Sequence, residues 1–563
     1  MKPARMRTVV PFMSPARPLL LELDLARGLA EAPPATPLEA ARARGVPVLR
    51  HVVAGLRLAA ADPDVAGLIV HVGQQQPSLA ASGELRAAIA GFGDAGKPTS
   101  CWSESYGEMG PGNVAYHLAT ACDQIWLQPS GDLGLTGVVA QVVFVRAAFD
   151  KLGVEPQIGQ RHEYKTAAEV LTRTEMSPAH REMAQRLVAS ATETIVADVA
   201  STRGLSREQV SDAIAHAPLT AEEALRRGLV DRTGYRDEVY ADLRRRLGDV
   251  ELRYVERYRK HKQHDRAAAL VRRNRPAVAV IQASGPIRLG RSGGRSPLSG
   301  PSIGSDSLGA ALRAAGDDAH VRAVVLRVDS PGGSYLASDA IRREVLRLRA
   351  TGRPVVASMG AVAASGGYYV AMPADVVVAS PGTITGSIGV LAGKQVLREA
   401  LERIGVRRDS VSTGPYAEMF STDRPFTDDE WQRLEEWLDR IYADFTAKAA
   451  QDRGLDVDAL RSVARGRVWT GADARERGLV DGLGGLDHAV DVACARAGIV
   501  RDRSVVRPLP KSSVLDRLRP AGSSEHPGAA SPSPVPALLP QALAALGLPA
   551  YGVLTAPVLW RLG

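Results

Sequence analysis

The chain has 563 residues, of which 45% are hydrophobic and 23% charged, and its formal net charge is +8. This length exceeds what one hydrophobic core usually supports, so we expect two or more domains of an ordinary globular protein rather than a disordered chain. The three cysteines are scattered and show no Cys-x-x-Cys spacing, which indicates neither a disulfide framework nor a zinc site.

The N-terminal 25 residues are partly basic but contain no apolar run of signal-peptide length. No stretch before residue 527 approaches the roughly 18 apolar residues that cross a bilayer. These features predict a protein that is cytoplasmic or peripherally associated with a membrane, without an N-terminal anchor.

Apolar, β-rich runs then alternate with helical patterns along most of the chain. In the second half, residues 277–283, 323–329, 354–359 and 375–380 are predicted strands, and residues 338–352 and 429–454 are predicted helices. This alternation predicts an α/β fold of βαβ units. The fully apolar strands indicate a largely parallel sheet covered by helices on both faces.

Two segments stand apart from this pattern. The basic run at residues 253–275 favours a solvated helical linker over a surface for nucleic acid or anionic lipid, so we expect no nucleic-acid partner. The tail has no charged residue between positions 527 and 560, and several prolines between Pro532 and Pro557 argue against one straight spanning helix. It predicts either a segment that contacts a membrane surface or a partner, or a Pro-rich appendage.

The chain also repeats itself. Asp123 matches Asp375, Gly134 matches Gly386 and Tyr164 matches Tyr416, and the members of each pair lie 252 positions apart. The segment "TAEEALRRGLVD" echoes "TGADARERGLVD" at nearly the same spacing. We therefore predict a tandem duplication, with the ranges 1–246 for a first copy, 247–275 for the basic linker, 276–500 for a second copy and 501–563 for the tail.

Two glycine-rich motifs of the second copy are candidates for chemistry. In "AASGGYYVA", Ser365 is expected after a strand and a small-residue turn, at the start of a helix, where free backbone N–H groups favour an oxyanion. The N–H of Gly366, together with one from the turn at Gly332 and Gly333, would supply the two donors that a tetrahedral intermediate needs.

The duplication acts as an internal control for these residues. Ser365 corresponds to Asn113, so the first copy lacks the candidate nucleophile. Lys165 corresponds to Ala417, so the second copy lacks that lysine. A buried lysine with a lowered pKa can act as the base for a serine, and packing of the two copies side by side would bring the pair together.

The motifs "DSPGGS", "AASGGYYVA", "SPGTITGSIGV" and "YKTAAE" resemble those of the signal peptide peptidase family called protease IV, in its long, duplicated form. The resemblance covers about residues 18 to 500. It implies a Clp-protease/crotonase-like fold and a serine endopeptidase that cleaves remnant signal peptides and other small or unfolded chains without a metal or organic cofactor.

For the site, the resemblance implies that Ser365 is the nucleophile, Lys165 the general base and Ser387 a serine that holds the lysine. It further implies a homo-oligomer, a tetramer, whose active sites face an enclosed chamber. Anchoring by an N-terminal transmembrane helix is typical of the family, and this sequence departs from that pattern.

Three alternatives remain at this point. A crotonase-type acyl-CoA enzyme would share the fold but would need a carboxylate near the oxyanion turn, for which Asp375 is the nearest candidate. A non-catalytic scaffold would need neither Ser365 nor Lys165. Finally, Lys394 is the other lysine near the motifs of the second copy and an alternative base.

Overall fold

The computed structural model describes residues 17–33, 44–73, 76–267, 275–292, 301–509 and 554–555. The expectations for the extreme N-terminus and for most of the tail concern residues outside these ranges. None of the described helices combines the length and the apolar composition that a bilayer crossing requires.

The first copy is built on a six-stranded, parallel sheet in the order β8-β4-β3-β2-β1-β9. Its strands are β1 (Leu19–Asp24), β2 (Val65–His71), β3 (Thr99–Ser103), β4 (Gln124–Leu127), β8 (Arg232–Thr233) and β9 (Glu251–Tyr254). The accompanying helices are α2 (Leu49–Ala60), α3 (Leu79–Gly93), α4 (Asn113–Ala119), α5 (Arg146–Leu152), α6 (Glu169–Thr172), α7 (Pro178–Arg203), α8 (Arg207–Ala215), α9 (Ala221–Arg226) and α10 (Arg236–Leu247).

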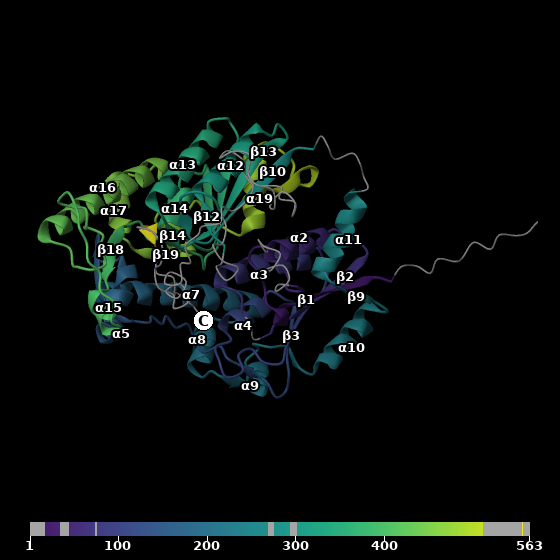
Figure 1. The fold of residues 1–563 in the computed structure, drawn as a ribbon. Helices are drawn as coiled ribbons and strands as arrows, with labels where there is room; N and C mark the ends of the chain where they lie inside the picture. Colours follow the sequence, from purple (N-terminus) through teal and green to yellow (C-terminus); the bar gives the residue numbers. More distant parts are fainter. Residues whose placement is uncertain are drawn as a thin grey trace, which may run out of the picture.

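Six strands of the second copy repeat this arrangement, in the order β20-β16-β15-β13-β10-β21. They are β10 (Ala277–Ser284), β13 (Val321–Ser330), β15 (Val355–Ala364), β16 (Val376–Ala379), β20 (Gly482–Leu483) and β21 (Val505–Leu509). Two further strands, β17 (Ile384–Gly386) and β19 (Val468–Thr470), extend from β15 and bring this sheet to eight strands. The helices of the second copy are α12 (Ser305–Asp317), α13 (Tyr335–Arg349), α14 (Gly366–Ala371), α15 (Arg398–Arg403), α16 (Asp428–Arg453), α17 (Val457–Val463), α18 (Gly471–Glu476) and α19 (Leu486–Arg496). The predicted α/β duplication is therefore confirmed, and Figure 1 shows the first copy in purple to teal and the second in teal to yellow-green.

Equivalent hydrogen bonds show how closely the copies correspond. The buried Tyr116 hydroxyl donates to the Leu229 carbonyl oxygen at 2.6 Å, and Tyr368 donates to Leu479 at 3.1 Å. The longest helix of each copy, α7 or α16, begins at a Ser or Thr N-cap and ends at a glycine in the left-handed conformation. The duplicated sequence thus determines where the longest helix begins and ends in both copies.

The structure differs from the sequence-based expectations in three places. Strand β15 continues to Ala364, so no separate turn precedes Ser365. Strand β9 lies within the predicted linker and pairs with β1, and the linker's helix α11 (Val255–Ala267) packs on α2. Strand β21 lies within the predicted tail and pairs with β10. Both edge strands close the same side of their own sheet.

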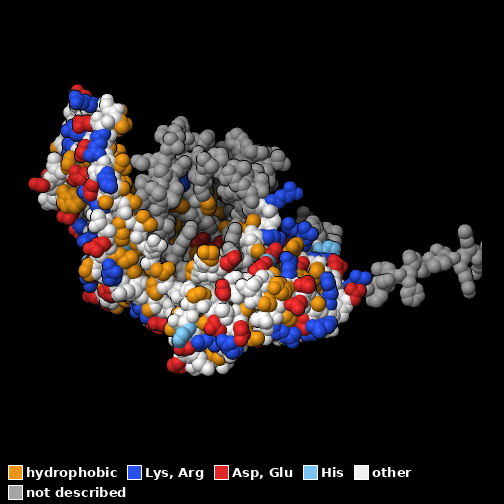
Figure 2. Space-filling model, turned by 90° about the horizontal axis from the view of Figure 1, so that it is seen from below, with side chains coloured by type: hydrophobic (Ala, Val, Ile, Leu, Met, Phe, Trp, Pro, Cys, Tyr) orange, Lys and Arg blue, Asp and Glu red, His pale blue; other side chains and the backbone are white. Residues whose placement is uncertain are grey.

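The two copies exchange contacts across a shared interface. Strand β6 (Glu155–Gln160) of the first copy pairs antiparallel with β18 (Leu391–Val396) of the second. Helix α7 packs on β19 (Val468–Thr470), which pairs with β17 (Ile384–Gly386) beside β15. In Figure 2 the molecule is hollowed on the face seen from below, and hydrophobic side chains border the hollow.

A buried charge cluster also joins the copies. The carboxylate of Glu84 on α3 forms an ion pair with Arg327 on β13, and both side chains are almost fully buried. Glu31 and Asp329 lie close enough to interact with this pair. Burial raises the pKa of Asp329, and burial together with the charge of Asp329 raises the pKa of Glu31. Arg327 is thus the cation that offsets several carboxylates at the interface.

Replacing this cation should destabilise the protein. Because removal of one partner leaves buried charge uncompensated, we expect Arg327→Met to lower stability by about 3–5 kcal/mol at pH 8. The carboxyl groups of Glu31 and Asp329 have raised pKa values and therefore bind protons more readily in the folded state. The loss of stability caused by Arg327→Met should therefore be smaller at about pH 5. Thermal unfolding at both pH values measures the effect.

Arg57→Met is the matched control, because Arg57 pairs with Asp487 across the same interface at 2.6 Å but is 37% exposed. Its cost should stay below about 1 kcal/mol. Equal losses for the two variants would show that burial of the Arg327 cluster does not matter.

Candidate active site

Ser365 occupies the junction between a buried strand and a short helix. It directly follows the last residue of β15, without the predicted turn, and it is the N-cap of α14, at the helix start where the sequence places it. Its backbone N–H donates to the Gly386 carbonyl oxygen at 2.8 Å, and its φ of 55° is one that side-chain-bearing residues rarely adopt. The side chain is fully buried. Such a conformation persists only where the surroundings enforce it.

Lys165 reaches this serine from the first copy. The pairing of β6 with β18 carries the first copy's chain into the second, and the Arg161 N–H continues it by donating to the Val390 carbonyl oxygen at 3.0 Å. Four residues later, the Lys165 amine lies 2.7 Å from Ser365 Oγ. The structure therefore brings together the two residues that the sequence comparison paired across the copies.

Ser387 completes the surroundings of the amine. Lys165 Nζ lies 3.0 Å from Ser387 Oγ and 3.2 Å from the Ser387 carbonyl oxygen. Ser387 is itself fixed, because its N–H donates to the Arg467 carbonyl oxygen at 2.7 Å. Two oxygen atoms of one residue thus accept N–H groups of the amine, while the third neighbour is Ser365.

Burial decides the charge of this lysine. The side chain is fully buried, and the resulting desolvation lowers the pKa of Lys165 from 10.5 to about 7. A neutral amine has two N–H groups and one lone pair. With both N–H groups donated to Ser387, the lone pair is free to accept the Ser365 hydroxyl proton.

Two glycines that the sequence analysis did not single out make room for Lys165. A Cβ at Gly466 would lie 2.5 Å from the Lys165 backbone nitrogen, and one at Gly389 would lie 3.2 Å from Lys165 Cδ. Gly466 also has a φ of 81°. The sequence gives no sign of this role, because each glycine is crowded by Lys165, which lies some 220 to 300 positions away in the chain.

Residues with a strained backbone cluster around Ser365 and Lys165. Among the described residues, five that are not glycine have a positive φ, and four of these are His162, Ser365, Ser387 and Arg465. Two belong to the site, and the other two lie within three residues of Lys165 or next to Gly466. Strain of about 1–3 kcal/mol at each such residue is typical of functional sites.

The predicted oxyanion glycines lie beside Ser365. Gly332 and Gly333 form the short strand β14, and a Cβ at Gly366 would lie 3.1 Å from the Gly333 nitrogen. The Gly332 N–H donates to Ser330 Oγ at 3.1 Å. The Gly333 and Gly366 N–H groups are consequently the better placed pair of donors.

The first copy has no equivalent arrangement. The Asn113 side chain exchanges two hydrogen bonds with the Gly137 backbone, at 2.8 and 3.0 Å, where the second copy has Ser365. Ala417, the counterpart of Lys165, is exposed on the surface. The first copy therefore contributes Lys165 to the pair, and the second contributes Ser365.

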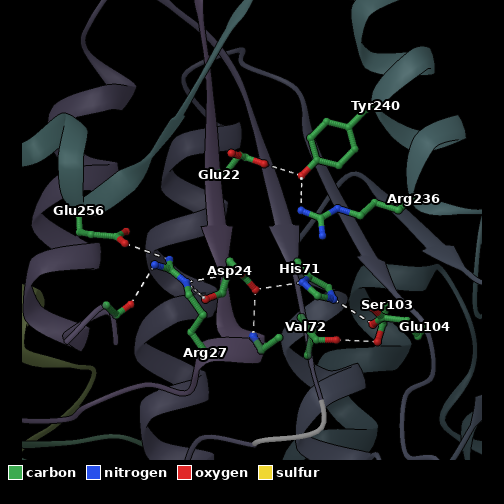
Figure 3. Close-up of polar contacts among 12 residues, drawn as sticks. Glu22, Asp24, Arg27, His71, Val72, Ser103, Glu104, Arg236, Tyr240 and Glu256 are labelled. Carbon is green, nitrogen blue, oxygen red and sulfur yellow. Dashed lines mark hydrogen bonds and ion pairs between the residues drawn. The ribbon is translucent and has the colours of Figure 1, made fainter. Parts of the chain in front are cut away.

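A second polar cluster, which the sequence analysis missed, lies at the carboxyl ends of β1 to β3 (Figure 3). His71 contacts Asp24 at 3.0 Å through Nδ1 and Glu104 at 2.9 Å through Nε2. The neighbouring Ser103 hydroxyl instead donates to the Val72 carbonyl oxygen at 2.6 Å. Since both ring nitrogens face carboxylates, His71 has no nitrogen directed at this serine, and the cluster is not a Ser-His-Asp triad.

The residues that the alternative assignments would use, Lys394 and Asp375, form hydrogen bonds to other groups. Lys394 donates to the Met419 carbonyl oxygen at 2.8 Å and lies over the Phe426 ring. Asp375 accepts the Val355 N–H at 2.8 Å, just as its counterpart Asp123 accepts the Thr99 N–H. Asp375 and its counterpart Asp123 thus have the same structural role, each in its own copy.

No group of His, Cys, Asp and Glu side chains in the described part of the chain is arranged to hold a metal ion. The three cysteines are buried free thiols.

Comparisons with known proteins find matches to both copies of the chain. Residues 92–250 and 347–499 match Peptidase family S49, once in each copy. The chain is 35% identical over 475 residues to the chloroplastic serine protease SPPA of Arabidopsis thaliana, covering 83% of this chain and 68% of that protein. It is 34% identical to Protease 4 of Salmonella typhi, covering 79% and 71%, and 32% identical to Protease 4 of Haemophilus influenzae, covering 78% and 72%.

The burial of Lys165 predicts a pH-dependent stability difference. Between pH 7 and 10.5 the unfolded lysine keeps its proton while the folded one has lost it, so this group makes the wild type more stable as pH rises. The stability of Lys165→Met minus that of the wild type should therefore fall over this window, by up to about 1.4 kcal/mol per pH unit.

Thermal unfolding of both proteins from about pH 7 to pH 10 provides the measurement. The exposed Lys151→Met is the control and should show no such trend. A flat difference for Lys165→Met would mean that its amine titrates as an ordinary lysine.

Proposed function

The chain belongs to peptidase family S49, and from this membership we propose that Ser365 and Lys165 form the dyad with which it cleaves peptide bonds. The observation that carries the proposal is the 2.7 Å contact between the Lys165 amine and Ser365 Oγ, with both side chains fully buried. The substrate class is remnant signal peptides and other small or unfolded polypeptides, cut as an endopeptidase.

In the first half of the reaction, the neutral Lys165 amine accepts the Ser365 proton while Oγ bonds to the carbonyl carbon of the scissile peptide. The carbonyl oxygen becomes an oxyanion. When the intermediate collapses, the C–N bond breaks and the Lys165 ammonium returns its proton to the departing amine. The product at this stage is an acyl ester on Ser365.

Water completes the cycle by the same route. Lys165 takes a proton from water, the hydroxide oxygen bonds to the ester carbon, and collapse returns the proton to Ser365 Oγ as the carboxylic product leaves. Ser387 keeps the amine oriented through both halves. The N–H groups of Gly333 and Gly366 are assigned to the oxyanion in both tetrahedral intermediates, with Gly332 shaping the strand that presents them.

The competing acyl-CoA and scaffold functions are less well supported. The acyl-CoA function would use Asp375, whose carboxylate caps a backbone N–H of the sheet. A scaffold gives no reason to bury a lysine against two serines. The proposal also includes a homo-oligomer, a tetramer, which rests on the family resemblance. It includes membrane contact through the C-terminal tail, which rests on the apolar composition of that segment.

The dyad is tested by cleavage of unfolded casein and of a fluorogenic peptide. Ser365→Ala and Lys165→Met should each lower kcat/KM by about a thousandfold or more, since both remove a group that bonds or moves a proton in the transition state. Lys165→Arg should be equally inactive, because a guanidinium does not release its proton.

Asn113→Ala and Lys394→Met are the matched controls at the counterpart position and at the alternative base. Both should keep near wild-type kcat/KM. If Lys394→Met lost activity while Lys165→Met kept it, the base would have been assigned wrongly.

The crowding at Gly466 generates a separate prediction. In Gly466→Ala the new methyl group meets the Lys165 backbone, so the amine should shift and kcat should fall by about a hundredfold with little change in KM. Gly454→Ala is the control, because Gly454 also has a positive φ but an added Cβ there meets no atom within 4 Å. Equal kcat values for the two variants would contradict the positioning argument.

A further inference from the structure

A short strand from the far end of the chain lies against the proposed oxyanion glycines. Leu554 and Thr555 form β22, which pairs antiparallel with β14, so that Gly333 faces Leu554 and Gly332 faces Thr555. On its other side, β14 pairs with β11 (Ile287–Arg288), so β22 fills the remaining edge of a small sheet (Figure 1). This is the edge that borders Ser365.

The fit of this strand is close. A Cβ at Gly332 would lie 2.0 Å from the Leu554 carbonyl oxygen and 2.7 Å from the Gly366 nitrogen. The Leu554 carbonyl therefore lies beside the donors assigned to the oxyanion. The Leu554 side chain is fully buried and belongs to the hydrophobic core of the second copy. An extended backbone and an inserted apolar side chain are what strand-addition recognition of a peptide requires.

The composition of the tail fits the same role. The segment "ALLPQALAALGLPAYGVLTAPVLW" is apolar, uncharged and rich in small residues, as are the hydrophobic regions and cleavage sites of signal peptides. The 44 residues between Leu509 and Leu554 extend to at most about 150 Å, so the same chain's tail can reach its own site.

We propose that the C-terminal segment around Leu554 and Thr555 occupies the peptide-binding edge of its own active site and competes there with substrate peptides. This inference rests on the proposed function, because that function assigns Gly333 of β14 to the oxyanion and so places bound peptides beside this strand. A tethered competitor of this kind leaves the site free for only part of the time, and the apparent KM or Kd for every other peptide is the intrinsic value divided by that free fraction.

Binding rather than turnover gives the sharpest test. All variants carry Ser365→Ala, so that neither the probe nor the tail is cut, and the probe is a fluorescent peptide of residues 549–559 followed by anisotropy. Leu554→Asp cannot insert its side chain into the core, and we expect it to bind the probe about tenfold more tightly than the parent. Leu554→Ala should show a smaller gain in the same direction.

Val500→Asp is the control, since it makes the same chemical change at a residue that is 60% exposed. It should bind the probe as the parent does, and thermal unfolding verifies that all variants are folded. Unchanged affinity in folded Leu554→Asp or Leu554→Ala would overturn the proposal. A gain that appears only at high protein concentration would overturn it too, because the competing tail would then belong to a second molecule.

The two proposals fail differently in these experiments. If the probe binds more tightly to Leu554→Asp but no protein with an intact Ser365 cleaves peptides, the tail assignment stands and the catalytic assignment is wrong. If cleavage occurs but removal of the Leu554 side chain changes no affinity, the tail assignment alone is wrong.

Discussion

The structure depends on keeping one amine out of water. Under the proposed mechanism, Lys165 can act as a base only while it is buried, since desolvation is the cause that lowers its pKa to about 7. The cost of burying it is limited by the oxygen atoms of Ser387, which accept its N–H groups without adding a negative charge. A carboxylate in the same place would stabilise the ammonium and raise the pKa again. In the part of the chain that the structure describes, desolvation is the cause of the lowered pKa and no charged group contributes, which is as important as the two hydrogen bonds.

The interface between the copies serves this burial. Strand pairing between β6 and β18 sets the direction of the chain that carries the lysine, and α7 covers β19 from the other side. Gly389 and Gly466 let the lysine backbone and stem approach closely. Farther along the interface, the buried Glu84–Arg327 ion pair joins helix α3 of the first copy to strand β13 of the second. Packing at a distance from Ser365 thus determines its reactivity.

Much of this could be predicted from the sequence, for a specific reason. Duplication converts one sequence into two aligned ones, so a residue present in only one copy, such as Ser365 or Lys165, stands out against its counterpart. The strand and helix order followed from periodicity within each copy. By contrast, Gly466, β22 and the cluster around His71 owe their roles to contacts between distant segments. No local pattern encodes such contacts, so the sequence left them unassigned.

Division of the dyad between the two copies has a consequence for how the protein is made. The lysine is synthesised first and the serine 200 residues later, and neither copy by itself holds both groups. A nascent chain, a truncated product or a half that has folded without its partner contains no complete site. Under the proposed mechanism, hydrolysis therefore requires that the whole polypeptide is complete and that its two copies have docked, so a chain that is still being synthesised cannot be cut by its own site.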